Sequence, residues 1–164
     1  MSRKAFRRGA TTTSTTLSDL GEIGDKRFED GKTYRLVYAA TTQANQALLY
    51  LDSADASLAS YQVQAVDAST DAVWCVNATG ASLASGTYFW GQVEGPWAAT
   101  YAAFSTKADN AAESPIFLDA DTVMGTGLVS GRESFGHTLV SLTSKATDAD
   151  DAGPYTVYLK CQGS

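Results

Sequence analysis

The chain has 164 residues, enough for one domain that buries a hydrophobic core without needing a metal ion or a disulfide. Charged residues make up only 18% of it, and no apolar run is long enough to span a membrane, so the sequence predicts no membrane partner. Four basic side chains and no acidic one lie in the first eight positions. The rest of the chain then has 8 basic and 18 acidic side chains, a net charge of −10. Because such an acidic body repels phosphate groups, we expect no nucleic-acid partner.

Residues 1–25 predict an extended, basic, Thr-rich N-terminal arm. Their apolar content is low, and paired glycines are typical of a linker. Threonine is β-branched and favours extended backbone, so the arm is suited to adding a strand to the edge of a partner. A solvated arm without a partner is the alternative. The residues expected to bind a partner surface or a neighbouring copy are Arg3, Lys4, Phe6, Arg7, Arg8, Thr11, Thr12, Thr13, Thr15 and Thr16.

Residues 26–164 predict a single β-rich globular domain. Runs of β-branched and aromatic residues alternate with Gly, Pro, Asn and Asp at spacings typical of a sandwich or a barrel. The expected fold class is therefore all-β, a compact β-barrel or β-sandwich. Two segments, 52–60 and 106–114, are compatible with short helical turns. The expected strands are 32–40, 46–52, 60–68, 71–78, 86–94, 97–105, 115–124, 136–144 and 154–162.

Catalytic and metal-binding patterns are weak throughout the chain. The chain has one histidine, His137, and no G-x-S-x-G motif of a nucleophile elbow. It also has no glycine-rich segment with the Gly-Lys-Ser/Thr ending of a phosphate-binding loop. Cys75 and Cys161 match no metal spacing and lie in strand-like runs, which favours buried thiols, with one disulfide as the alternative. We therefore expect no enzyme activity, no cofactor and no metal site.

Two further patterns have an ordinary structural interpretation. Acidic pairs near residues 119–121 and 148–151 place carboxylates two apart, but they lack the other ligands of a calcium loop and are interpreted as solvated loops. The triplet at Asn77 has the form of a glycosylation site, but the sequence begins with no pattern of a secretion signal, so we interpret it as a chance match.

The segment "GTYFWGQVEGPW", residues 86–97, concentrates the aromatic side chains of the chain. On an extended strand Tyr88 and Trp90 share one face while Phe89 and Val93 share the other, so at least one set belongs to the core or to a contact surface. Indole rings also stack on sugars, so a carbohydrate-binding module is an alternative that requires Trp90 or Trp97 to be exposed. We expect Tyr88, Trp90 and Trp97 to serve the fold and its contacts.

The segment "LASGTYFWGQVEGPWAA" resembles the small–small–Gly–x–Tyr–aromatic–Trp–x–Gln–Val–x–Gly segment of tailed-phage virion proteins, particularly the small capsid decoration (cement, head-stabilising) proteins. The stretches "FEDGKTYRLVYA" and "FGHTLVSLTS…YTVYLKC" are similar to the opening and closing strands of that family. The resemblance follows the order of features over residues 28–161, and its specific part is 88–95. The basic arm and the acidic "TDADDAG" depart from the family pattern.

The resemblance implies a non-enzymatic virion structural protein on the outer surface of a phage capsid, assembled in the bacterial cytoplasm. It would stabilise the shell by bridging major capsid proteins, with its arm extended along the capsid or an adjacent copy and with copies of itself expected as a homotrimer. Many weak contacts repeated over the shell would oppose the internal DNA pressure. Alternatives are another virion component (neck, tail tube or head fibre) and a carbohydrate-binding module on the virion.

Overall fold

The computed structural model describes residues 9–52, 61–66, 72–99, 104–105, 115–119, 123–126, 134, 136–138 and 155–163. Regular structure in these residues is almost entirely strand, which confirms the all-β prediction. One 3-10 helix covers Leu17–Asp19. The strands are β1 (Lys26–Glu29), β2 (Lys32–Ala39), β3 (Leu48–Leu51), β4 (Gln62–Ala65), β5 (Cys75–Val76), β6 (Tyr88–Ala99), β7 (Phe104–Ser105), β8 (Pro115–Asp119), β9 (Val123–Thr126), β10 (Gly136–Thr138) and β11 (Tyr155–Lys160).

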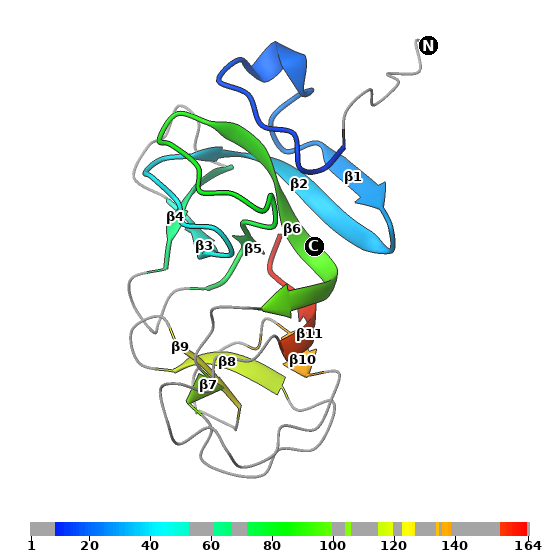
Figure 1. Ribbon diagram of the computed structural model, residues 1–164, viewed down its shortest axis with the longest axis vertical. Coiled ribbons are helices and arrows are strands. Elements are labelled where there is room, and N and C mark those ends of the chain that lie inside the picture. The colour runs from blue at the N-terminus through cyan, green and yellow to red at the C-terminus, as the bar shows by residue number, and fades with distance from the viewer. Residues whose placement is uncertain are drawn as a thin grey trace.

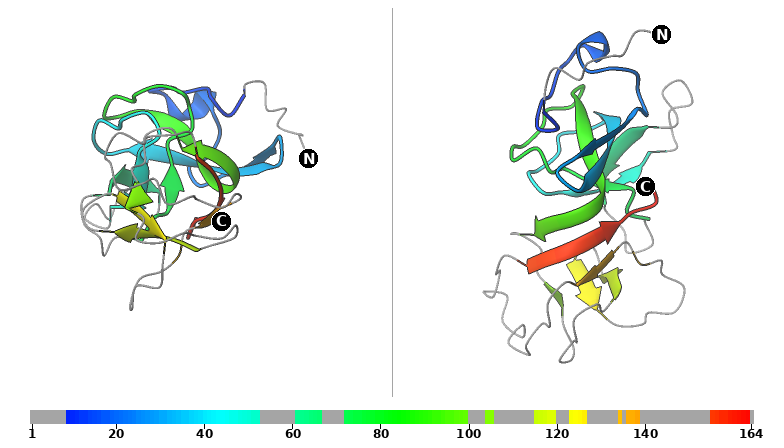
Figure 2. Two further views of the ribbon diagram at one scale, coloured as in Figure 1. Left: turned by 60° about the horizontal axis from the view of Figure 1, so that its bottom comes forward. Right: turned by 90° about the vertical axis from the view of Figure 1, so that its right-hand side faces the viewer.

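Five strands form a partly closed barrel in the order β2-β4-β3-β5-β6, because β6 also pairs with β2 (Figure 1). The β2–β4 pairing is parallel, and the other pairings of this ring are antiparallel. The ring is weakest where β5 meets β6, through the single pair Val76 and Gln92. Strand β1 extends the sheet from β2, and β11 extends it from β6 toward β10, β8, β9 and β7 (Figure 2).

The barrel interior is filled by alternate residues of β2 and β6. Val37 pairs with Phe89, and both are fully buried with Leu49 and Val63 from the opposite wall. Close packing of this interior explains Gly91. A Cβ on that residue would lie 2.6 Å from the Sγ of Cys75, so the strand has room for no side chain there.

The other face of β2 and β6 is covered by residues 9–20, here named the N-terminal segment. Leu36 and Trp90 point to this side, and Ala10 and Leu20 pack against them. Ser14 forms an antiparallel bridge with Tyr88, with two hydrogen bonds of 3.1 and 2.8 Å between their main chains. Without the segment this face of the barrel would be exposed, so these residues belong to the packed body of their own chain.

Strand β6 continues where the sequence suggested two strands. The expected break at Gly95-Pro96 is wrong, because β6 runs unbroken through both residues and changes partner from β2 to β11. Gly95 permits the change through a left-handed φ of 102°, and a Cβ there would lie 2.7 Å from the carbonyl oxygen of Gly31. The expected single strand at 115–124 is likewise wrong, because β8 and β9 form an antiparallel pair.

Beyond the barrel, Val157 and Leu159 of β11 pack with Trp97 of β6 in a third buried cluster. The residues that follow β11 return to the barrel: Cys161 and Gly163 donate main-chain hydrogen bonds to the carbonyls of Val93 and Trp74. The guanidinium of Arg35 in turn donates to the carbonyls of Gly163 and Gly24. Several distant parts of the chain thus converge on β2 and β6.

Candidate interaction surface

Two loops with the same pattern of turns are hydrogen-bonded to each other at one end of the barrel. Residues 40–47 and 77–87, here named the loop pair, are joined by a reciprocal bridge in which Gln43 and Leu83 each donate a main-chain hydrogen bond of 2.8 Å to the other. In each loop a residue with left-handed backbone follows three positions later, Gln46 (φ 61°) and Gly86 (φ 86°), and a strand begins two residues after that. The loop pair is therefore a local structural repeat.

Asn77 holds the loop pair together from inside. Its side chain is fully buried, and its Nδ2 donates to the carbonyls of Ala44 (2.8 Å) and Ala81 (2.9 Å), one in each loop. Its Oδ1 accepts from the hydroxyl of Thr79 at 2.7 Å and from the main-chain N–H of the same residue. Every polar atom of this side chain thus has a partner, so Asn77 is a structural clamp in this fold and its amide is not presented for glycosylation.

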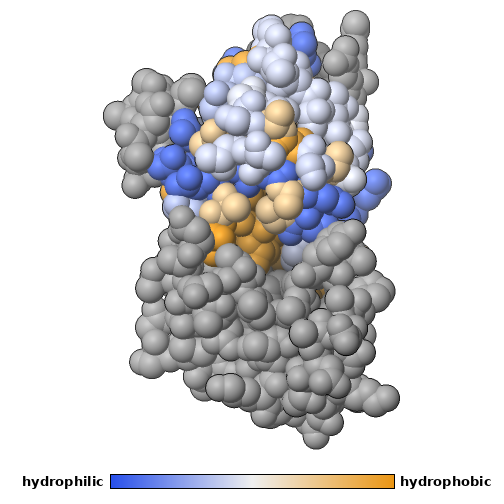
Figure 3. Space-filling view, turned by 60° about the vertical axis from the view of Figure 1, so that its left-hand side comes forward, coloured by the Kyte–Doolittle hydropathy of each residue, from blue (hydrophilic) through white to orange (hydrophobic). Residues whose placement is uncertain are grey.

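The outer surface of the loop pair carries small side chains and no charge. No Asp, Glu, Lys or Arg occurs in residues 36–51 or 72–93, although the whole chain has a net charge of −6. Pale colours, which mark neutral hydropathy, dominate the upper part of the face in Figure 3. Small side chains lose little entropy on contact, and a clamped backbone loses little more, so the surface is suited to protein binding. Its exposed residues are Thr41, Thr42, Ala44, Gly80, Ala81, Ser82, Ala84 and Ser85.

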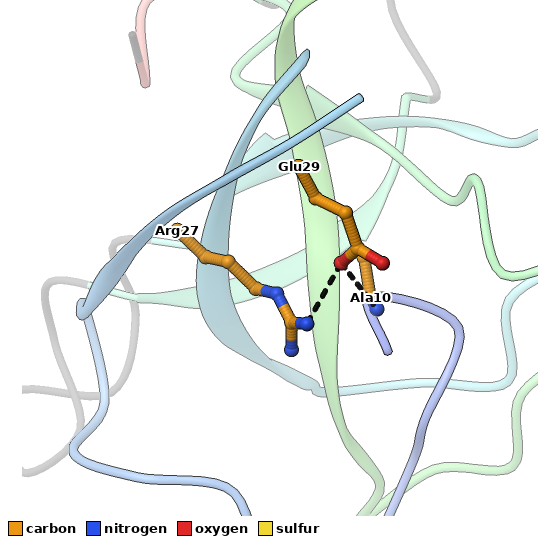
Figure 4. A network of polar contacts seen from close by, with 3 residues as sticks. All are labelled: Ala10, Arg27 and Glu29. Carbon is orange, nitrogen blue, oxygen red and sulfur yellow. Dashed lines mark hydrogen bonds and ion pairs between the residues drawn. The ribbon is translucent and has the colours of Figure 1, made fainter. Parts of the chain in front are cut away.

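The arm residues expected to bind a partner divide at Gly9. Arg3, Lys4, Phe6, Arg7 and Arg8 lie outside the described residues. The chain then meets the body at Ala10, whose N–H donates to the Glu29 carboxylate at 3.0 Å, while Arg27 forms an ion pair with the same carboxylate at 2.8 Å (Figure 4). The threonines that follow remain accessible to different extents: Thr11, Thr13, Thr15 and Thr16 are exposed and Thr12 is half-buried.

The two tryptophans of the 86–97 segment are buried. Trp90 is 1% exposed and Trp97 is 4% exposed, so neither offers an indole face for a sugar. Tyr88 is half-buried and stacks at a tilt against Tyr38, with ring centroids 5.0 Å apart. Trp90 and Trp97 are therefore part of the packed interior, and the stacking platform that a carbohydrate-binding module needs is missing at these two tryptophans.

The two cysteines are buried thiols, as expected, and not a disulfide. Burial raises the pKa of the Cys75 thiol well above its usual range, and the nearby Cys161 raises it further. Burial also raises the pKa of Cys161. Both groups therefore stay protonated at neutral pH, which makes them poor nucleophiles and poor metal ligands. The Tyr34 phenol also stays protonated at neutral pH, because burial and the Glu29 and Asp30 carboxylates raise its pKa.

No group of three or more His, Cys, Asp or Glu side chains converges in a metal-binding arrangement within the described residues. His137 lies in β10, paired with Tyr158 and Pro115. Of the acidic pairs, Asp119 ends β8, and positions 121 and 148–151 fall outside the described parts.

Comparison with protein-family models, with curated proteins and with solved structures finds no match. None of the helical structure described is long or apolar enough for a membrane crossing. The loop pair was not predicted from the sequence, although one signal was present there. Two charge-free stretches, each with turn residues two and three positions before a strand, stand forty residues apart in the chain.

Asn77→Asp is expected to destabilise the protein by about 3 kcal/mol or more at pH 7, because a buried carboxylate would face two carbonyl oxygens. Burial would raise the pKa of the new carboxyl group, so the lost stability should return in part as the pH falls and that group is protonated. Urea unfolding at pH 7 and pH 4.5, relative to the unsubstituted protein at each pH, measures both effects. An unchanged unfolding midpoint at pH 7 would contradict the role of Asn77 as a clamp.

Proposed function

We propose that this chain is a non-enzymatic structural protein of a tailed-phage virion, which binds the outer surface of the capsid and stabilises it by bridging major capsid proteins. The observation that carries the proposal is the loop pair, a rigid and uncharged surface at one end of a β-barrel. A contact that is repeated many times over a shell needs little affinity at each site, because simultaneous engagement supplies avidity. The resemblance of residues 88–95 to decoration proteins supports the same function.

The N-terminal arm in this proposal is shorter than the sequence indicated. Residues 9–20 cover Trp90 and Leu36 of their own chain and are needed there. Residues 1–8 carry Arg3, Lys4, Arg7 and Arg8 together with Phe6, and these are the residues that would reach an acidic capsid surface or a neighbouring copy. The threonines from Thr11 to Thr16 would contact the partner by their exposed side chains.

Assembly would take place in the bacterial cytoplasm, and the mature location would be the capsid exterior. Three copies around a local symmetry axis are the arrangement that we propose for the bound state. The loop pair would then lie against the major capsid protein, and the acidic remainder of the body would face solvent. No cofactor or nucleic acid takes part in this mechanism.

A charged residue on the loop pair should weaken capsid binding. Ser82→Glu places a carboxylate on the exposed uncharged surface, and desolvating it on contact should weaken binding at least about tenfold. Ala98→Glu is the matched control, because Ala98 is also small and exposed but lies on β6 beyond Gly95, where it pairs with Thr156 of β11. Sedimentation of each variant with capsids that lack the protein measures the affinity. Equal binding of both variants would contradict the role of the loop pair.

Deletion of residues 2–8 tests the arm without uncovering the barrel. The shortened chain should unfold at the same urea concentration as the full chain, yet bind capsids at least about tenfold more weakly and with a smaller dependence on salt. A longer deletion that includes Ala10 and Ser14 should lower stability as well, since it removes packed residues. Full-affinity binding by the shorter deletion would exclude a role for the arm.

The number of copies per virion separates capsid decoration from the other virion locations. Quantitative mass spectrometry of purified virions should find about one copy for every one to three major capsid proteins. About a dozen copies or fewer in each particle would instead indicate a neck, tail-tube or head-fibre component. Absence of the chain from virions would overturn the proposed function.

A further inference from the structure

Strand β1 presents an edge that no described residue covers. It pairs with β2 on one side, where Glu29 and Lys32 close a two-residue turn. In such a hairpin the residues next to the turn exchange both of their main-chain hydrogen bonds, and the pattern alternates along the strand. Arg27 and Glu29 therefore direct their main-chain groups to β2, whereas Lys26 and Phe28 direct theirs outward.

An apolar side chain lies at the centre of this edge. Phe28 is 76% exposed and is the one large hydrophobic side chain with high exposure among the described residues. Figure 1 shows β1 and the adjoining end of β2 projecting from the side of the barrel. A projecting strand with unpaired main-chain groups and an exposed aromatic ring is a ready template for pairing with another strand.

The hairpin is held in one shape before any partner binds. Its turn residues Asp30 and Gly31 have left-handed backbone, with φ values of 51° and 74°. On the inner face, the Arg27 guanidinium lies 5.7 Å from the centre of a Trp90 ring and pairs with Glu29. These contacts fix which face of β1 is inward, so Phe28 stays outward and the ordering cost of binding is small.

The order of charges along the strand selects the partner. Residues 26–30 read Lys-Arg-Phe-Glu-Asp, two positive charges before the phenylalanine and two negative charges after it. If two such strands pair antiparallel about Phe28, Arg27 of each copy lies opposite Glu29 of the other, and Lys26 lies opposite the turn residue Asp30, one position beyond the end of β1. Opposite charges directly across an antiparallel pair are stabilising, and like charges are destabilising.

Other registers do not satisfy the charges. Sliding one strand by two residues places Arg27 opposite Arg27, or Glu29 opposite Glu29, and an in-register parallel pair places every charge against its own kind. A slip by one residue would misalign the outward main-chain groups of Lys26 and Phe28. With two charges of each sign, the edge has no net attraction for a purely acidic or purely basic partner. Its best complement is a second copy.

We propose that two copies of this chain associate about a twofold axis through Phe28, with their β1 strands pairing antiparallel and their sheets joined into one. The two phenylalanine residues would be directly opposite and would exchange both main-chain hydrogen bonds. The exposed edge disappears and the two aromatic rings cover each other. This twofold contact is separate from the threefold arrangement proposed for the capsid-bound state. It does not depend on the proposed function, because it requires no capsid and uses none of the loop pair.

Paired charge reversals test the contact and its register. In a homodimer, Lys26→Glu sets the new carboxylate against the Asp30 carboxylate twice, and Asp30→Lys sets the new ammonium group against the Lys26 ammonium group twice. Each variant alone should therefore dimerise at least about tenfold more weakly. An equimolar mixture of the two variants restores an attractive arrangement and should form a heterodimer of the original affinity. Sedimentation velocity of the full chain, of mass 17.3 kDa, measures the dimer fraction against concentration.

Controls separate the proposed contact from misfolding and from other contacts. Lys160→Glu reverses an exposed lysine on β11 and should leave dimerisation unchanged. Circular dichroism and thermal unfolding confirm that each variant is folded, which matters for Asp30→Lys because of its left-handed backbone. A full chain that stays monomeric at every concentration would overturn the proposal, as would a mixture no better than its two components.

A cysteine introduced at the centre of the edge gives a second readout of the register. Residues that face each other in a hydrogen-bonded antiparallel pair have Cα atoms about 5.5 Å apart, within the range of a disulfide. Phe28→Cys should therefore form a covalent dimer on mild oxidation, whereas Lys26→Cys should not, since its own counterpart lies several residues away. The native thiols at Cys75 and Cys161 are buried and do not interfere. Equal crosslinking at both positions would contradict the proposed register.

Discussion

The antiparallel pairing of β2 with β6 is the contact on which the rest of the structure depends. It buries residues on both of its faces: Val37 and Phe89 fill the barrel, while Leu36 and Trp90 lie under the N-terminal segment. A strand pair that is apolar on both sides must be covered on both sides, because each exposed aromatic or aliphatic side chain would forfeit about 2 kcal/mol of burial. The barrel supplies one cover and the start of the chain supplies the other.

The alternation of residues explains how far the sequence could predict this fold. Strand periodicity at 32–40 and 86–94 indicated the two strands of the central pair but not their pairing, and it assigned Trp90 and Phe89 to opposite faces of their strand. It did not indicate β1, whose Lys-Arg-Phe-Glu run has no β-branched residue and is a strand because its turn and Trp90 hold it there. Nor could it show β6 crossing Gly95-Pro96, since the same dipeptide in another context ends a strand.

The candidate interaction surface was harder to predict because it arises from contacts between distant segments. The clamp at Asn77 joins carbonyls from two loops, and in the sequence the residue is visible only as part of a glycosylation triplet. The packed N-terminal segment was hidden for a similar reason. Its Ala10 and Leu20 are isolated apolar residues in a polar run, and their burial follows from the fold of β2 and β6. Composition alone describes such a run as a linker.

The position of the barrel's supports along the chain has a consequence for how the protein folds. Strand β2 needs Tyr88 to Glu94 as its partner, and the Arg35 side chain needs the carbonyl of Gly163, far downstream. During synthesis the early strands therefore emerge long before the segments that close and brace them. Such non-local pairing makes folding slow, and it leaves the edge of β2 that β6 will cover open to other chains meanwhile. We therefore expect the incompletely folded chain to be prone to aggregation at high expression.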